Sequence, residues 1–211
     1  MATPTTASPT WLRRNRLWLI LLPVLLLLAM AASSFRLTAL YLPWSWSHPI
    51  VAHGPTGTLS EEFMAIDGST HRRDVTVTVH AVQPVSRLGD DAAAAGGQLW
   101  RLDLTFAAPP DQIVDLCSVL LVDAVGNRYD SERAGKVAAP DATWWWSERV
   151  ACVPEDAPGP KDSILGIEES PVPRPESWPV TAGVVLPAGV EPVGVVVRWH
   201  EPTYLQLDVP A

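Results

Sequence analysis

Cys117 and Cys152, the only two cysteines of this 211-residue chain, have a chemistry that depends on the compartment around them. In a reducing compartment they would be buried thiols, whereas in an oxidising one a structural disulfide is the expected state. The chain contains no Cys-x-x-Cys motif, which argues against an oxidoreductase of that kind. The pair therefore predicts a disulfide if this part of the chain is exported.

Other residue types that carry chemistry lack the spacing that the chemistry needs. The five histidines are scattered, and no His-Glu-x-x-His motif places two zinc ligands on one helical face. Neither a Gly-x-Ser-x-Gly elbow nor a Gly-rich phosphate loop occurs. Residues 123–130 hold oxygen ligands around a turn, but not at the spacing of a calcium loop. We therefore expect that the protein is not an enzyme and that it has no catalytic residue, metal site or cofactor.

Trp144, Trp145 and Trp146 form an unusual run of three consecutive tryptophans. Neighbouring residues of a strand point to opposite faces, so three such rings cannot all be buried on one face. One ring would then be exposed for contact with a partner or the membrane. Alternatively, the loop folds onto the domain and hides all three.

Residues 17–35 predict a transmembrane helix. They are 19 residues without a charge, about 28 Å of helix, which is close to the hydrocarbon thickness of a bilayer. Arg13, Arg14 and Arg16 precede this span, so the positive-inside rule places residues 1–16 in the cytoplasm as a short tail. The alternative is a cleaved signal peptide, because residues 29–31 imitate a small-residue cleavage site. Both alternatives export the rest of the chain.

The net charge of the exported part argues against nucleic acid as a partner. Residues 1–36 hold four arginines and no acid, which leaves 11 basic against 23 acidic residues and a net charge of −12 beyond residue 36. Such a surface repels phosphate backbones. The expected partners are the lipid bilayer, through residues 17–35, and another envelope protein.

Alternation with a period of two dominates the exported part. The clearest case is 98–106, where Trp100, Leu102, Leu104 and Phe106 alternate with polar residues. The predicted strands are 58–66, 74–82, 98–106, 117–125, 147–153, 180–186, 193–199 and 204–209. Residues 90–97 are expected to be a hairpin loop, and the Pro-rich residues 154–179 a long irregular crossover. About eight short strands indicate an antiparallel sandwich.

The domain organisation follows from these segments. Residues 36–57, rich in Pro and Gly, predict a juxtamembrane linker, and residues 58–211 predict one extracytoplasmic β-sandwich domain. The fold class is therefore all-β, with an antiparallel β-sandwich preceded by one N-terminal transmembrane helix. The expected location is the cell membrane, with a single pass and the N-terminus in the cytoplasm.

A basic N-terminus, a Leu-rich span and a Trp- and Pro-containing segment precede strands that carry Cys117, Cys152, the run 156–160, Ser177-Trp178 and a final Trp199-His-Glu-Pro202. This arrangement resembles uncharacterised single-pass envelope proteins of high-GC Gram-positive bacteria and is broadly similar to immunoglobulin-like extracytoplasmic domains. The resemblance implies an immunoglobulin-like sandwich in the cell envelope and no active site. We therefore expect a membrane-anchored binding or accessory module. The alternative is an envelope enzyme or ligand-binding receptor with a site on the sandwich loops.

Overall fold

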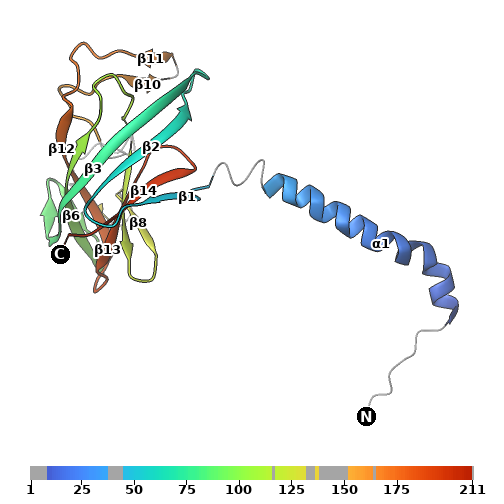
Figure 1. Ribbon diagram of the computed structural model, residues 1–211. Coiled ribbons are helices and arrows are strands. Elements are labelled where there is room, and N and C mark those ends of the chain that lie inside the picture. Colours follow the sequence, from blue (N-terminus) through green and yellow to red (C-terminus); the bar gives the residue numbers. More distant parts are fainter. Residues whose placement is uncertain are drawn as a thin grey trace. The chain divides into compact units, whose positions relative to one another are not determined.

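The computed structural model describes residues 9–37, 45–115, 117–131, 136–137, 152–163 and 165–210. The chain forms two compact units that divide between Ser45 and Trp46. The first unit contains the helix α1 (Pro9–Arg36), and the second contains the strands (Figure 1). An N-terminal helix followed by β-structure confirms the predicted fold class.

Helix α1 begins earlier than the predicted span, because its first turns include the three arginines. Its 22 residues Arg13–Ser34 are long and apolar enough to cross a membrane, at about 33 Å of helix. They are a candidate membrane span or signal sequence. Pro23 lies inside this helix, where it removes one backbone hydrogen bond.

Two sheets form the sandwich of the second unit. The five-stranded sheet has the order β1 (His48–Val51), β14 (Thr203–Asp208), β13 (Pro192–Arg198), β7 (Ser118–Asp123) and β8 (Arg128–Asp130). The four-stranded sheet has the order β12 (Ser177–Pro187), β6 (Gly97–Ala107), β3 (Thr70–Val85) and β2 (Thr56–Met64). All of these neighbours are antiparallel except β1 and β14, which pair in parallel.

Two small sheets complete the described strands. One is the hairpin of β10 (Lys161–Ser163) and β11 (Gly166–Glu168), and the other joins β4 (Arg87–Leu88), β5 (Asp91–Ala93) and β9 (Lys136–Val137). The hairpin β10–β11 and the tip of the hairpin β2–β3 both lie at the upper end of the sandwich in Figure 1. This end contains the candidate site.

The hydrophobic core fills the space between the two main sheets. The alternation read from the sequence supplies it, because every second residue is buried from Arg73 to Val79 in β3 and from Leu102 to Phe106 in β6. The main core residues of these strands and of the facing sheet are Val75, Val77, Val79, Leu102, Leu104, Phe106, Val195, Val197, Leu205 and Leu207. Burial of this apolar surface is the main force that holds the sheets together.

Four predicted segments differ from the described structure. The linker assigned to 36–57 is too long, because β1 and the start of β2 lie within it, and Trp46 packs on the outer face of the five-stranded sheet. Residues 90–97 contain β5, and the crossover 154–179 contains the hairpin β10–β11. Of the predicted strand 147–153, Cys152 and Val153 are not in a strand, and the rest lies outside the described residues.

Candidate binding site at one end of the sandwich

Three large apolar side chains project from neighbouring hairpin tips at the upper end of the sandwich. Met64 and Ile66 at the β2–β3 turn are 69% and 61% exposed, and Leu165 at the β10–β11 turn is 88% exposed. The two turns adjoin, because a Cβ added at Gly166 would lie 3.7 Å from the carboxylate of Asp67. We call Met64, Ile66 and Leu165 the apolar tip.

A small hydrophobic cluster supports the apolar tip from below. Phe63, Ala65 and Ile113 are buried there, and the partly buried Ile167 of β11 packs against them. The backbone N–H of Ile66 also donates to the carboxylate of Asp162, at 3.1 Å. These contacts, made by Asp162 of β10 and Ile167 of β11, tie the hairpin to the β2–β3 turn.

A buried ion pair lies deeper in the same end. Glu61 of β2 and Arg73 of β3 are directly opposite in the antiparallel register, and their side chains are 2.5 Å apart. The Arg73 side chain is 1% exposed and that of Glu61 is 4% exposed. Burial raises the pKa of Glu61 and lowers the pKa of Arg73, and in each case the opposite charge acts against this shift.

Aromatic rings and a carbonyl complete the surroundings of Arg73. Its Nε donates to the carbonyl of Ile113 at 2.7 Å, and its guanidinium carbon lies 4.1 Å from the centre of the Phe63 ring. The Trp199 ring is 5.3 Å away, and His200 stacks on Phe63 at 4.7 Å. The Arg73 Nη2 has no hydrogen-bond partner among the described residues, so the ring faces supply part of its electrostatic contact. Arg73 thus joins β2, β3 and the loop before β7.

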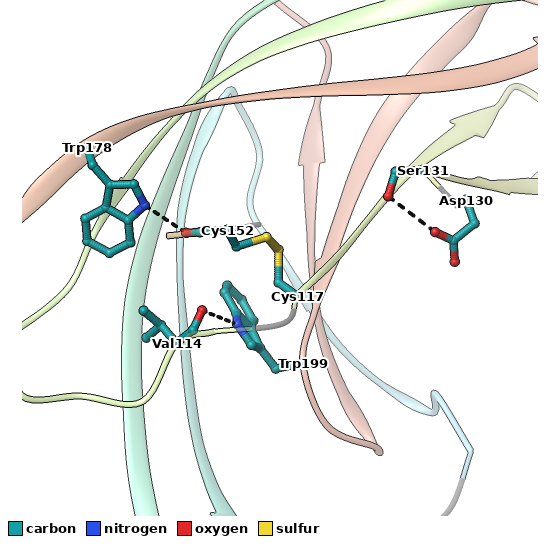
Figure 2. Close-up of a disulfide and its surroundings, with 7 residues drawn as sticks. All are labelled: Val114, Cys117, Asp130, Ser131, Cys152, Trp178 and Trp199. Carbon is teal, nitrogen blue, oxygen red and sulfur yellow. Dashed lines mark hydrogen bonds between the residues drawn. A yellow bond between two sulfur atoms is a disulfide. The ribbon is translucent and has the colours of Figure 1, made fainter. Parts of the chain in front are cut away.

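The disulfide predicted between Cys117 and Cys152 is present, with a Cα–Cα distance of 5.7 Å and both residues fully buried. Figure 2 shows two indole rings beside it, each donating to a backbone carbonyl. Trp178 Nε1 donates to Cys152 at 2.8 Å, and Trp199 Nε1 donates to Val114 at 3.0 Å. The disulfide and the two indole rings hold the segment before β7 and the segment around Cys152 against the core.

Arg174 has a similar structural role on the Pro-rich crossover. It is 1% exposed, and its guanidinium donates to the carbonyls of Pro109 and Gln112 at 2.7 and 2.9 Å. The guanidinium carbon of Arg174 lies 4.7 Å from the centre of the Trp178 ring, and burial lowers the pKa of Arg174 to about 10. Arg174 remains charged at neutral pH and holds the crossover to the loop that follows β6.

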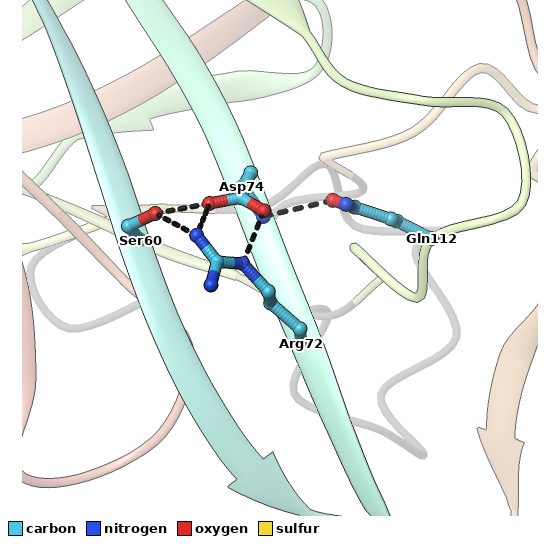
Figure 3. Close-up of polar contacts among 4 residues, drawn as sticks. All are labelled: Ser60, Arg72, Asp74 and Gln112. Carbon is cyan, nitrogen blue, oxygen red and sulfur yellow. Dashed lines mark hydrogen bonds and ion pairs between the residues drawn. The ribbon is translucent and has the colours of Figure 1, made fainter.

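Polar residues on the outer face of β2 and β3 form a separate network (Figure 3). Arg72 Nε donates to the carboxylate of Asp74 at 2.7 Å, and the Ser60 hydroxyl donates to the same carboxylate. Gln112 accepts a hydrogen bond from the backbone N–H of Asp74 at 2.8 Å. The hydrogen bonds from Arg72 and then from Ser60 are the main causes that lower the pKa of Asp74 to about 2.

Of the other residues singled out in the sequence, those that the structure describes do not gather at one site. Asp123 accepts hydrogen bonds from the backbone of Val125 and Asn127 and from the Tyr129 hydroxyl, which makes residues 123–130 an ordinary hairpin. The described residues contain no group of three or more His, Cys, Asp or Glu able to hold a metal ion. Trp144, Trp145 and Trp146, predicted to make a contact, lie outside the described residues.

Sequence reasoning missed Arg73, although a signal was available. The inward-facing series Val75, Val77 and Val79 places Arg73 on the buried face when it is extended by two residues. In β2 the same period places Glu61 between the buried Leu59 and Phe63. Opposite charges at buried positions of two paired strands indicate an ion pair. Arg174 had no such signal, because it lies in irregular chain.

No protein-family model, curated protein or solved structure matches the chain. The geometry described above is therefore the basis for a functional proposal.

Proposed function

We propose that the protein is a membrane-anchored extracytoplasmic module that binds another envelope protein and has no catalytic activity. The observation that carries this proposal is the apolar tip, Met64, Ile66 and Leu165, on two hairpins that contact each other. Exposed apolar side chains on adjoining turns favour contact with another protein.

Helix α1 supports the anchoring, since its apolar residues are long enough to span a bilayer. The disulfide supports an oxidising compartment, because such bonds are rare in the cytosol. Both observations favour the same location, with the sandwich outside the cytoplasm.

An immunoglobulin-like relationship is part of the proposal and rests on one of the two sheets. The order β14-β13-β7-β8 matches the G-F-C-C′ order of variable-type immunoglobulin domains. The other sheet differs from that pattern, because β2, β3 and β6 follow one another as a meander before β7 begins. The relationship is therefore one of architecture.

Site-specific photocrosslinking in living cells tests the binding function. A photoreactive residue in place of Leu165 should give a discrete crosslinked protein band. The matched control is Val125, which is 83% exposed in the β7–β8 turn at the other end of the sandwich and should give no such band.

The double change Met64→Ser and Ile66→Ser should abolish the band from position 165 without altering the abundance of the protein. Equal crosslinking from positions 165 and 125, or a band that survives the double change, would show that the apolar tip is not the binding surface.

A further inference from the structure

The two main sheets have four outer edges, and three of them are closed to further strand pairing. The edge strands β1 and β8 of the five-stranded sheet have only four and three residues. Short edge strands and prolines are two ways in which proteins prevent unwanted pairing. The four-stranded sheet has longer edges, β12 with 11 residues and β2 with 9.

Prolines close the edge of β12. The N–H of Ala108 donates to the carbonyl of Glu176, and the N–H of Ala188 donates to the carbonyl of Gly96. Even-numbered residues of this strand therefore bond to β6, and odd-numbered residues direct their backbone groups to the free edge. Pro179 and Pro187 are odd-numbered members of β12, so each removes a donor from that edge.

Among the described residues, strand β2 has no such protection. The N–H of Val79 donates to Pro55, and that of Ala65 to Ser69, so the odd-numbered residues bond to β3. The even-numbered residues direct their N–H and C=O groups to the free edge, and all five are exposed: Thr56, Thr58, Ser60, Glu62 and Met64. None is a proline, and among the described strands β2 pairs with β3 alone.

We propose that two copies of the chain pair through β2, antiparallel, about a two-fold axis at Ser60. In this register Thr56 faces Met64 of the second copy, Thr58 faces Glu62, and Ser60 faces Ser60. All of these residues direct their backbone groups to the edge, so the pair forms about ten backbone hydrogen bonds. The result is one continuous eight-stranded sheet.

The charges along β2 favour this register. Glu62 is the only charged residue among the five that face the edge, and the two-fold axis places it opposite an uncharged threonine. Like charges directly opposite one another would destabilise the pair, and here they do not occur. A symmetric pair through identical surfaces is also the commonest form of oligomer.

This pairing goes beyond the binding function proposed above, and the two surfaces share only Met64. The hydrogen bonds form along the backbone edge of β2, whereas crosslinking at Leu165 reports on the hairpin tip. Failure of either experiment therefore leaves the other unaffected.

Spin-label distances in the full chain test the proposed pairing. The protein is held in excess detergent, so that two copies do not share a micelle by chance, and is labelled without reductant to keep the disulfide closed. Nitroxides at Ser60→Cys should lie within about 20 Å of each other, because paired Cα atoms are about 5.5 Å apart. The control Thr181→Cys lies on β12, seven strand spacings or about 34 Å across the sheet from its copy. Its register with Asp103 and Ala81 also places it about 20 Å along the strands from the two-fold axis, so its labels should lie about 50 Å apart or more.

Two lysine variants separate the β2 contact from any pairing of the helices. Ser60→Lys places two ammonium groups opposite each other at the axis and should weaken the dimer by tenfold or more. Thr58→Lys places each ammonium opposite Glu62 and should leave the dimer intact, with near-UV circular dichroism confirming that both variants are folded. A monomeric wild-type chain, a dimer whose Ser60 labels are as far apart as those at Thr181, or equal effects of the two lysines would overturn the proposal.

Discussion

Arg73 and Glu61 illustrate how one cross-strand pair decides the stability of an end of the fold. Their side chains are almost fully buried, so each charge depends on the other for compensation. Arg73→Met should therefore destabilise the protein by about 3–5 kcal/mol, because it leaves the Glu61 carboxylate buried without its partner. Denaturant unfolding of the full chain in detergent, followed by tryptophan fluorescence, measures this cost.

The double variant Arg73→Met with Glu61→Leu supplies the control. Replacement of a whole buried pair by apolar side chains is often neutral or stabilising, so the second change should recover most of the loss. If the two single costs simply add, the pair is not coupled and Arg73 acts through its packing against Phe63 and Trp199 instead.

The lowered pKa of Asp74 predicts that its contribution to the free energy of unfolding is lost in acid. Its folded pKa of about 2 lies below the ordinary value of 3.8, so the unfolded chain takes up its proton first as the pH falls. The contribution is fully present above about pH 4 and is lost between there and pH 2. Asp74→Asn should flatten the fall in unfolding free energy over that interval, measured by denaturant titration at each pH.

Arg72→Gln should have the same effect, because Arg72 is the largest cause of the lowered pKa. An unchanged slope in both variants would show that the network of Figure 3 does not hold the carboxylate in its charged form.

At the scale of elements, strands that alternate cleanly were predictable and paired segments without alternation were not. The strand predicted over 98–106 is β6, Gly97–Ala107, because one buried face imposes a period of two. Strand β1 was not predicted. Its Pro49 is unusual in a strand, and the strand exists through parallel pairing with β14, which is far away in the sequence. The hairpin β10–β11 was missed for the same reason, because it is held by Asp162 and Ile167 rather than by its own pattern.

The candidate site divides in a similar way. The disulfide was predictable because the sequence has only two cysteines and its N-terminal apolar segment predicts export. The apolar tip was not, because a solitary exposed apolar residue in a turn has no pattern, and its meaning comes from two hairpins brought together.

The disulfide should contribute strongly to the stability of the sandwich. It closes a loop between residues separated by 35 positions, for which the chain-entropy model gives about 4 kcal/mol. Cys117→Ala with Cys152→Ala should lower the unfolding free energy by an amount of that order, measured against the oxidised wild-type chain. Two freely alkylatable thiols in natively exported protein would contradict the pairing.

At the scale of the whole molecule, charge separates the two units. Three arginines precede the uncharged part of α1, and beyond residue 36 acidic residues outnumber basic ones by 12. The positive-inside rule therefore predicts insertion with these arginines in the cytoplasm and the acidic domain on the other side.

Orientation is tested by labelling one introduced cysteine on each side of α1 with a membrane-impermeant maleimide. Val125→Cys, in the exposed β7–β8 turn, should react in intact cells, because the positive-inside rule places the sandwich outside. Ala2→Cys, in the N-terminal segment, should react only after lysis.

An epitope tag at the N-terminus should remain on the mature protein if α1 anchors the chain, and should be lost if a signal peptidase removes it. Reaction of Ala2→Cys but not of Val125→Cys in intact cells would reverse the orientation, and with it the oxidising compartment on which the disulfide depends.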